Sequence, residues 1–401
     1  MPVRDAVLWV DSPSVMLRRV CGMSALERQL FVLAAAGIRR VWIAAARPES
    51  ADSMRLPAEL EVHWINRDGD HPVESAVPYA VVSGDHFVRR DALRSLFAEP
   101  PVRHVSYQDA DRRPVVQLVV SRGDRVLQVE KRPMSAGTFM RVDNGAETEE
   151  WLLDEARKSH DGFMARVFDR HLSLAISRRL LNTPITPNQM TVFSTLVGLN
   201  GCILFLGPTP SWDIVGAGLV WLHSVLDGCD GEIARLKYRQ SKLGGILDFW
   251  GDNVVHVALF SCLGLSRYWT HDSVLYLGLA ALASLASAGS AWLAYKSAFK
   301  PAAEQTGFKG FGALKTKDAT GDALKRVEDT LAQRDFIYLL VLVAIFHRQD
   351  LFLWCGAIGA PIFLVVLMYL TAQSAAPEEG NARAATQAQP ALTPSTRGQT
   401  S

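Results

Sequence analysis

The pattern of hydrophobic and polar positions changes near residue 160. Before it, short apolar runs alternate with helical patterns, and between 189 and 373 long apolar runs dominate. The first pattern is typical of a soluble α/β domain, and the second of helices that cross a membrane. We therefore predict an α/β domain with a mostly parallel sheet, followed by an all-α membrane domain.

Short apolar runs in the first half are spaced as strands. The strands are expected at residues 5–10, 39–45, 61–65 and 79–85, with helices over 24–36 and near 91–97. Strands that alternate with helical patterns form βαβ units, whose strands run parallel. Two later runs, 115–120 and 126–129, predict a hairpin around Gly123 and Asp124.

Six apolar segments follow in the second half. They lie at about 190–208, 213–234, 244–266, 272–296, 335–348 and 351–372. An ideal span needs ~20 apolar residues, and several of these segments are shorter or more polar. The expectation is a polytopic domain of six transmembrane helices, of which the fifth is the least regular.

Basic residues lie in alternate connections between these segments. They precede the first segment, separate the second from the third, and separate the fourth from the fifth, whereas the opposite loops carry Arg267 and Arg348. Cytoplasmic loops of membrane proteins are enriched in Lys and Arg. We therefore expect both termini and the soluble domain in the cytoplasm; if the source is a bacterium, the membrane is the inner or cell membrane.

Residues 161–182 form a basic amphipathic stretch directly before the membrane segments. Its apolar positions recur at roughly helical spacing, which indicates an interfacial helix or an ordinary surface helix. The resulting domains are 1–155 (soluble), 156–188 (interfacial helix and linker), 189–373 (membrane) and 374–401, a tail rich in Ala, Pro, Thr and Gln that we expect to be disordered.

Composition narrows the function classes. The chain of 401 residues is 49% hydrophobic and has a formal net charge of +1. A net charge this small argues against nucleic-acid binding. The five cysteines show no paired spacing, so neither a disulfide framework nor a thiolate zinc site is expected. Charges throughout residues 1–20 argue against a signal peptide.

Four aspartates lie within segments that are otherwise apolar enough to cross a membrane. Asp227 and Asp230 are three residues apart, and Asp248 and Asp252 are four apart, so each pair shares one helix face. Ionised groups at membrane depth cost ~2.5–3.5 kcal/mol each and usually mark a functional site. Carboxylate oxygens suit Mg²⁺ or Mn²⁺. The alternative is that the four cap helices or pair with nearby Arg and Lys.

Such a site is suited to phosphoryl transfer. A divalent metal neutralises phosphate charge, and a carboxylate near the acceptor can deprotonate its hydroxyl. Gly231 and Gly244 leave the backbone open to a bulky ligand, and the small Ala234 leaves room nearby. Arg235 can bind a phosphate through two N–H groups.

The motif Asp-x2-Asp-Gly-x2-Ala-Arg-x8-Gly-x3-Asp-x3-Asp, from Asp227 to Asp252, resembles the signature of the CDP-alcohol phosphotransferase family, also called CDP-alcohol phosphatidyltransferases. The resemblance covers about residues 160–372, including the stretch from Thr183 to Thr191. It implies a six-helix membrane fold, usually a homodimer. In the implied reaction a CDP-alcohol transfers its phospho-alcohol part to an acceptor hydroxyl and CMP leaves.

Roles follow by position from this resemblance. Asp227, Asp230, Asp248 and Asp252 would bind two Mg²⁺ or Mn²⁺ ions, and Asp252 would also be the base that deprotonates the acceptor. The residues that would contact the CDP-alcohol are Asn188, Thr191, Gly231, Ala234, Arg235, Ser241 and Gly244.

The acceptor side is less constrained by the sequence. The loop before the fifth segment contains Lys325, Arg326 and Arg334. There are two interpretations of these basic residues: they bind an acceptor phosphate, or they contact anionic lipid. His223 and His256 lie on the aspartate-bearing helices, and we interpret both as packing or hydrogen-bonding residues, because carboxylates alone suffice for a hard metal.

The first half is similar to sugar-nucleotide nucleotidyltransferases over roughly residues 5–145, through Gly22–Leu30, Ala36–Trp42 and Ser83–Asp85. In that family Asp85 would bind a metal. Those enzymes place a glycine-rich loop after the first strand to bind a triphosphate, whereas Val10–Val20 contains no glycine. We therefore favour a degenerate or regulatory domain over an active cytidylyltransferase.

The order of the two domains resembles bifunctional proteins with inositol-1-phosphate cytidylyltransferase and di-myo-inositol phosphate phosphate synthase activities. Three hypotheses remain. The first is a membrane enzyme of phospholipid or polyol-phosphate biosynthesis that uses CDP-diacylglycerol or CDP-inositol and an alcohol or polyol-phosphate acceptor. The second is a bifunctional enzyme that also makes the CDP-alcohol from CTP. The third is a catalytically silent, membrane-anchored nucleotide sensor.

Overall fold

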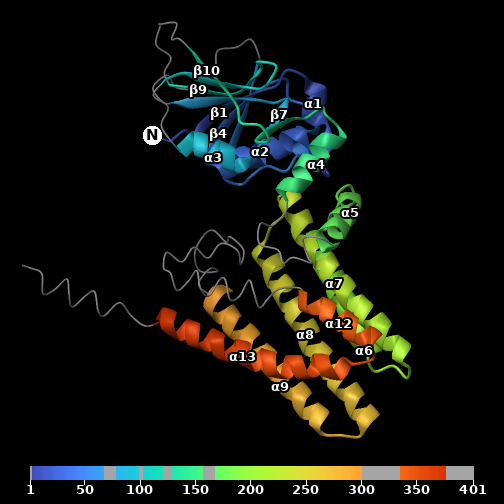
Figure 1. Ribbon diagram of the computed structural model, residues 1–401. Helices are drawn as coiled ribbons and strands as arrows, with labels where there is room; N and C mark the ends of the chain where they lie inside the picture. The colour runs from blue at the N-terminus through green and yellow to red at the C-terminus, as the bar shows by residue number, and fades with distance from the viewer. Residues whose placement is uncertain are drawn as a thin grey trace, which may run out of the picture. The chain divides into compact units, whose positions relative to one another are not determined.

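The computed structural model describes residues 2–66, 78–98, 103–120, 129–156, 168–299 and 335–375. The chain forms two compact units. The first unit contains the α/β domain, residues 166–193 and residues 225–244. The second contains the remaining helical segments. Figure 1 labels the elements by the names used below.

The α/β domain is built on a seven-stranded sheet in the order β10-β8-β9-β6-β1-β4-β5. The strands and helices are β1 (Asp5–Trp9), α1 (Pro13–Leu17), β2 (Arg19–Val20), β3 (Met23–Ser24), α2 (Ala25–Ala36), β4 (Arg40–Ala44), β5 (Glu61–Ile65), β6 (Tyr79–Ser83), β7 (His86–Val88), α3 (Arg90–Ala98), β8 (Val105–Gln108), β9 (Pro114–Val119), β10 (Glu130–Pro133), β11 (Phe139–Arg141) and α4 (Ala146–Glu155).

Four of the six strand pairings in this sheet are parallel, which confirms the predicted mostly parallel sheet. β1 pairs with β4 and β6, β4 with β5, and β10 with β8, all in parallel. β9 runs antiparallel to both β6 and β8. The predicted partner of β9 in a hairpin, residues 126–129, falls almost wholly outside the described residues, so that hairpin stays a prediction. Among the described strands, β9 pairs with β6 and with β8, a strand that the sequence did not predict. Residues 121–128 lie outside the described part.

Alternation along the central strands builds the core of this domain. In β1, Ala6 and Leu8 join a core cluster with Leu26 and Leu30 of α2. Val7, on the other face of β1, packs in a separate cluster with Trp42, Ala44 and Tyr79. Side chains of a strand alternate between its two faces, so both faces are buried. In Figure 1, α2 and α3 lie along the same side of the sheet.

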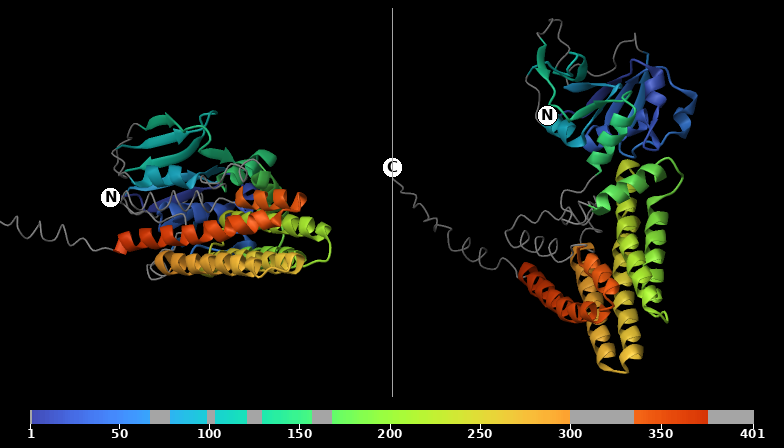
Figure 2. Two further views of the ribbon diagram at one scale, coloured as in Figure 1. Left: turned by 60° about the horizontal axis from the view of Figure 1, so that its bottom comes forward. Right: turned by 45° about the vertical axis from the view of Figure 1, so that its right-hand side comes forward.

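The helical half follows the apolar segments closely. Its helices are α5 (Arg170–Leu180), α6 (Pro187–Leu204), α7 (Pro210–Leu236), α8 (Lys242–His271), α9 (Leu275–Ala294), α12 (Asp335–Ile345) and α13 (Gln349–Ala375). The last turn of α9 continues as a π-helix over Tyr295–Phe299. α13 packs along α9, and α12 packs on α13 (Figure 2).

Three described helices are long and apolar enough to cross a membrane: α8, α9 with its extension to Ser297, and α13. α12 has only 11 residues, ~16 Å at 1.5 Å per residue, which is short of the ~30 Å hydrocarbon core. Large apolar side chains such as Leu285 (73% exposed) and Val365 (64%) face outward. Apolar exposure on this scale suits lipid rather than water.

The helix α5 buries polar residues and exposes apolar ones. The apolar Phe168, which precedes α5, and Leu172 are exposed, whereas Arg170, Ser173 and Ser177 are buried. The polar face therefore packs inward and the apolar side faces out. The part of the predicted amphipathic stretch before Phe168 lies outside the described residues.

Candidate metal and nucleotide site

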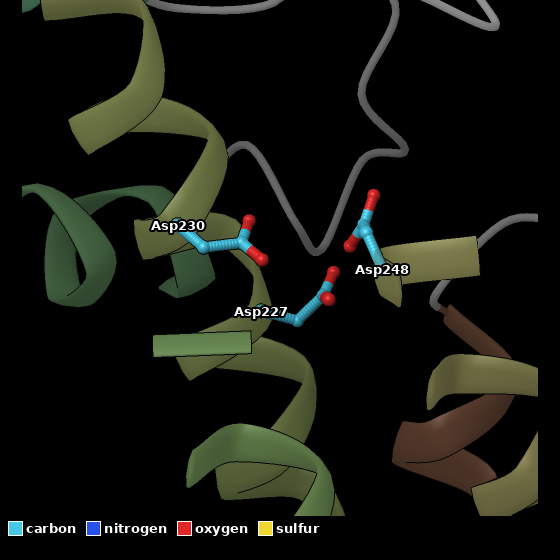
Figure 3. Close-up of side chains that lie close together, drawn as sticks. All are labelled: Asp227, Asp230 and Asp248. Atoms are coloured by element: carbon cyan, nitrogen blue, oxygen red, sulfur yellow. The ribbon is translucent and has the colours of Figure 1, made fainter. Parts of the chain in front are cut away.

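Three carboxylates converge from two helices. α7 presents Asp227 and Asp230, and α8 presents Asp248. One oxygen from each lies within 4.8 Å of the other two. Figure 3 shows the side chains of Asp227 and Asp230 directed toward Asp248, and that of Asp248 directed back. Helical spacing places Asp227 and Asp230 together on α7, and Asp248 on α8 completes a group of three of the four predicted aspartates.

Because the cluster is buried, ionising all three of its carboxyl groups has a high free-energy cost. Asp227 and Asp230 are each only 6% exposed, and Asp248 is partly exposed. Like charges at this separation repel, and burial strengthens the repulsion. A hard divalent cation bound among the oxygens removes that cost, and the donor set of three carboxylates fits Mg²⁺ or Mn²⁺.

Thr191 holds one of these carboxylates in place. It lies in the first turns of α6, is 3% exposed, and its hydroxyl donates a hydrogen bond to Oδ2 of Asp230. The same hydroxyl lies 3.2 Å from the carbonyl oxygen of Pro187. The structure thus gives the Thr191 hydroxyl a carboxylate partner, and the contact with the nucleotide that the sequence led us to expect stays a prediction.

Asp252 lies one turn beyond Asp248 on α8 and is not one of the three grouped carboxylates. Its Oδ1 is 3.4 Å from Nε2 of the buried His223 on α7. A Cβ on Gly198 would lie 2.9 Å from the His223 ring, so the close approach of α6 fixes that ring. His223 is therefore a packing and hydrogen-bonding residue, as the sequence suggested. His256 lies on the exposed side of α8.

Gly244, Asn188 and Ser241 lie together at the beginning of α8. A Cβ on Gly244 would be 2.9 Å from Oδ1 of Asn188 and 3.0 Å from Oγ of Ser241. The Ser241 hydroxyl accepts a hydrogen bond from the amide of Gly244 at 2.9 Å, which caps α8. A side chain at 244 would therefore displace the ends of Asn188 and Ser241, two residues that were each predicted to contact the nucleotide.

Arg235 and Gly231 form a second local arrangement, one turn apart on α7. A Cβ on Gly231 would lie 3.0 Å from Nη1 of Arg235, so the glycine makes room for the guanidinium. Nε of Arg235 donates to the carbonyl oxygen of Ala156 at 2.8 Å. Ala234, next to Arg235, is half-buried. Lys325, Arg326 and Arg334, the predicted acceptor residues, lie outside the described part of the chain.

A fifth acidic residue, Glu232, lies inside the motif and was missed. It is fully buried and accepts hydrogen bonds from Arg170 Nη1 (2.7 Å), Ser173 Oγ (2.8 Å) and Ser177 Oγ (2.7 Å). At 3.6 residues per turn it projects from roughly the opposite side of α7 to the aspartates. The polar residues at 170, 173 and 177 share one face of a helix, and this spacing is the sequence feature that could have predicted a buried polar partner for that face.

In the α/β domain, Asp85 closely follows the carboxyl end of β6. Burial raises the pKa of its carboxyl, and the neighbouring Asp11 raises it further. Its Oδ1 is buried and has no hydrogen-bond partner among the described residues. After β1, where nucleotidyltransferases have a glycine-rich loop, the chain forms the short helix α1 with a proline at its start.

Comparison with known proteins finds the same family that the motif resembles. Residues 184–362 match the family described as CDP-alcohol phosphatidyltransferase. This match covers somewhat less than half of the chain. The match contains all four aspartates of the motif, Asn188, Thr191 and the glycines. The resemblance seen in the sequence is therefore confirmed.

Two curated relatives carry names consistent with this domain. A "Bifunctional IPC transferase and DIPP synthase" of Thermococcus kodakarensis is 40% identical over 128 residues, 32% of this chain and 28% of that protein. A "Phosphatidylinositol phosphate synthase" of Corynebacterium glutamicum is 31% identical over 140 residues, 35% of this chain and 60% of that protein. The chain thus spans little more than a quarter of the length of the first relative.

Among solved structures, the chain resembles the phosphatidylinositol phosphate synthase of Mycobacterium tuberculosis with CDP-DAG bound. The alignment covers 50% of this chain and 93% of that chain, at 21% identity and a TM-score of 0.35. A similarity this low supports no argument about residues or ligands.

Proposed function

We propose that the chain is an integral-membrane transferase that moves a substituted phosphate group from a CDP-alcohol to an acceptor hydroxyl, with release of CMP. The observation that carries the proposal is the group of three carboxylates, Asp227, Asp230 and Asp248, inside the matched domain. Hard oxygen ligands at this density serve to bind a metal and, through it, a phosphate.

The three carboxylates, with Asp252 sharing a ligand role, are the proposed holders of Mg²⁺ or Mn²⁺, as two ions. A bound divalent cation neutralises the pyrophosphate and stabilises the leaving phosphate oxygen. Thr191 orients Asp230 through its hydrogen bond, so that its oxygens stay directed into the group. This is an orienting role of the kind that outer residues have at metal sites.

Asp252 is the proposed general base. Its carboxylate takes the proton of the acceptor hydroxyl while that oxygen attacks the phosphorus that carries the alcohol. The bond from this phosphorus to the bridging oxygen breaks, and CMP leaves with that oxygen and its electron pair. His223, 3.4 Å from Oδ1 of Asp252, keeps the carboxylate oriented for this step.

The donor is held at the ends of α6, α7 and α8. Arg235 is the proposed contact for a phosphate oxygen, and its Nε donates to the carbonyl oxygen of Ala156. The remaining proposed contacts come from residues 188, 191, 231, 234, 241 and 244, which lie on or beside these helix ends.

The motif and the order of the two domains suggest two classes of donor. CDP-diacylglycerol and CDP-inositol are the proposed donors, and an alcohol or polyol phosphate is the proposed acceptor. Lys325, Arg326 and Arg334 are the proposed ligands of the acceptor phosphate. A homodimer in the membrane is the proposed assembly, and membrane lipid its surroundings.

The proposed membrane arrangement keeps six spans, with the site and both termini at the cytoplasmic side. It also keeps the domain limits 1–155, 156–188, 189–373 and 374–401. The basic residues between the second and third segments, and the outward apolar side chains of α9 and α13, support it.

The test is CMP release by the purified protein in detergent or nanodiscs with Mg²⁺. CDP-diacylglycerol and CDP-inositol are each combined with inositol phosphate or glycerol phosphate. We expect one pair to give CMP, and Asp252→Asn to abolish it. Asp272→Asn is the matched control, because Asp272 follows α8 with a positive φ that Asn also accepts. Absence of CMP from all pairs would leave the silent membrane anchor as the better description.

Asp85 favours a second candidate, a bifunctional enzyme that also makes the CDP-alcohol from CTP. Its buried oxygen and raised pKa are of the kind found at functional sites. The test is CDP-alcohol synthesis from CTP and an alcohol phosphate, with Asp85→Ala as the variant and Asp91→Ala, at an exposed site, as the control. CTP consumption that Asp85→Ala removes would establish the bifunctional protein; no consumption by the unmodified chain would exclude it.

A further inference from the structure

The last residues of α7 are bound by the α/β domain. α7 ends at Leu236, and Tyr238 has a φ of 49°, so the helix stops in a left-handed residue. The carbonyl groups at such an end lack helical partners. Arg55 supplies them: Nη1 donates to the carbonyl oxygen of Lys237 at 3.1 Å and Nη2 to that of Tyr238 at 3.0 Å.

The guanidinium of Arg55 is suited in two ways to binding the carbonyl oxygens at the end of α7. Its planar fork meets two neighbouring carbonyls at once, which an ammonium does not do. Its positive charge lies at the negative end of the α7 dipole. Its own position is fixed, because its backbone amide donates to Oε1 of Glu27, the residue whose other oxygen caps α2.

An aromatic contact supports the same junction. The rings of Phe31 on α2 and Tyr238 stack with centroids 5.1 Å apart and planes 17° from parallel. Arg55 lies over Phe31 at 5.3 Å, and the buried Arg28 lies 6.0 Å from the Tyr238 ring. Burial raises the pKa of the Tyr238 phenol to about 12, so the side chain stays neutral.

The loop before α6 is drawn into the same junction. Nζ of Lys237 donates to the carbonyl oxygens of Thr183 (2.9 Å) and Ile185 (3.4 Å). A Cβ on Gly22, in the turn between β2 and β3, would lie 2.1 Å from the carbonyl oxygen of Leu181. No side chain fits there, so only glycine permits this approach. Asn188 and Thr191 follow this loop within one or two helical turns.

We infer that the α/β domain is a positioning element of the CDP-alcohol site, in which Arg55, Phe31 and Gly22 fix the end of α7 and the loop before α6. The inference rests on the proposed function for its kinetic consequence. Two residues proposed to hold the donor, Arg235 and Thr191, lie directly beside the fixed segments. The α/β domain would then be needed for CDP-alcohol binding in the helical part of the chain, even if it does not itself synthesise a CDP-alcohol.

The kinetic test compares Arg55→Ala, Arg55→Lys and Arg47→Ala in the full-length protein. Arg47 is the control, because it forms an exposed ion pair with Asp52 in the same connection. Small misplacements of binding groups are costly, so we expect Arg55→Ala to raise KM for the CDP-alcohol about tenfold, with KM for the acceptor unchanged. Arg55→Lys should recover part of the loss, and Arg47→Ala should match the unmodified protein.

Hydrogen exchange gives a readout that does not need turnover. In Arg55→Ala, amides of residues 236–240 and 189–192 should exchange faster, while those of β1 and β4 stay protected. If these amides are unaffected, or if both KM values are unchanged while only the folded fraction falls, the positioning role is wrong. Failure of CMP release in the unmodified protein would instead reject the proposed function and leave the exchange result to decide this inference.

Discussion

Carboxylates gather in two regions of the molecule, and what surrounds them differs. On α7 and α8, Asp227, Asp230 and Asp248 place oxygens within 4.8 Å of one another. In the α/β domain, Asp143 near Asp85 accepts two hydrogen bonds from Arg141, at 3.0 and 3.1 Å. A guanidinium that forms two charge-assisted bonds with a carboxylate already neutralises it.

This difference teaches that the number of acidic residues is a poor guide to a metal centre. Within the described chain, the α7/α8 group is the one set of three potential metal ligands that lie this close together. Glu232 makes the same point within α7, because its carboxylate is buried as deeply but is paired with Arg170 at 2.7 Å. A cation supplied by the protein makes a metal unnecessary, so the two regions should respond differently to the same substitutions.

The largest effect is expected from Asp248→Asn. Removing one of three carboxylates weakens the metal site and its stabilisation of the leaving phosphate, so CMP release should fall by ~100-fold or more. The measurement is the initial rate of CMP formation with Mg²⁺. The same assay on Asp143→Asn should give a rate within about twofold of the unmodified protein, since surface sites away from the chemistry have small effects. If the rate of CMP formation fell equally in both variants, the proposed difference between the two carboxylate regions would be wrong.

Disruption of the Glu232 pair should be the next largest effect, on stability rather than on chemistry. Glu232→Gln leaves Arg170 buried without its counter-ion, which costs ~3–5 kcal/mol. The measurement is the midpoint of thermal unfolding in detergent. Because replacing both charges removes the unpaired group, the double variant Arg170→Met, Glu232→Leu should recover most of the midpoint. No recovery would mean that the pair does more than neutralise charge.

Metal binding should appear as a smaller shift in the same unfolding assay. A ligand that binds only the folded state stabilises it by ~2.7 kcal/mol at 100 times its dissociation constant. Mg²⁺ or Mn²⁺ should therefore raise the midpoint of the unmodified protein, and EDTA should reverse the rise. Asp227→Asn should abolish this shift, whereas Asp85→Asn should retain it. A shift that is lost in Asp85→Asn would place a metal in the α/β domain.

The smallest effect concerns pH and Asp85. Burial raises the pKa of this carboxyl in the folded state, so the folded protein binds its proton more tightly than the unfolded chain does. Stability attributable to Asp85 is therefore present at low pH and falls as pH rises from the unfolded value of ~3.9 through the raised folded value. Asp85→Asn should unfold at a slightly higher temperature than the unmodified protein at pH 7. The two should converge as pH falls toward ~4, and a constant difference across this range would contradict the assignment.

The sequence predicted more of the helical half than of the sheet. Segment boundaries for α7, α8, α9 and α13 follow from long apolar runs, which have few alternative interpretations. β8 was missed, since a strand of four residues carries little periodicity and its pairing with β9 depends on distant parts of the chain.

Local spacing was sufficient for the aspartates and insufficient for their neighbours. The intervals between 227 and 230, and between 248 and 252, fix which residues share a helix face, because the α-helix has one repeat. The partners of Thr191, Arg235 and Glu232 depend on how α4, α5, α6 and α7 pack together. No interval in the chain specifies these contacts.

By itself, the sequence indicated the class of chemistry: carboxylates on apolar helices, in a fixed motif with the glycines and Arg235. The tertiary structure decided how those residues are held. It paired Glu232 with α5, buried the polar face of that helix, and fixed the end of α7 with Arg55, 182 residues away from Lys237. The physical reason is that periodicity is a local property of the chain, whereas buried polar groups take whatever partner the packed structure brings within hydrogen-bonding distance.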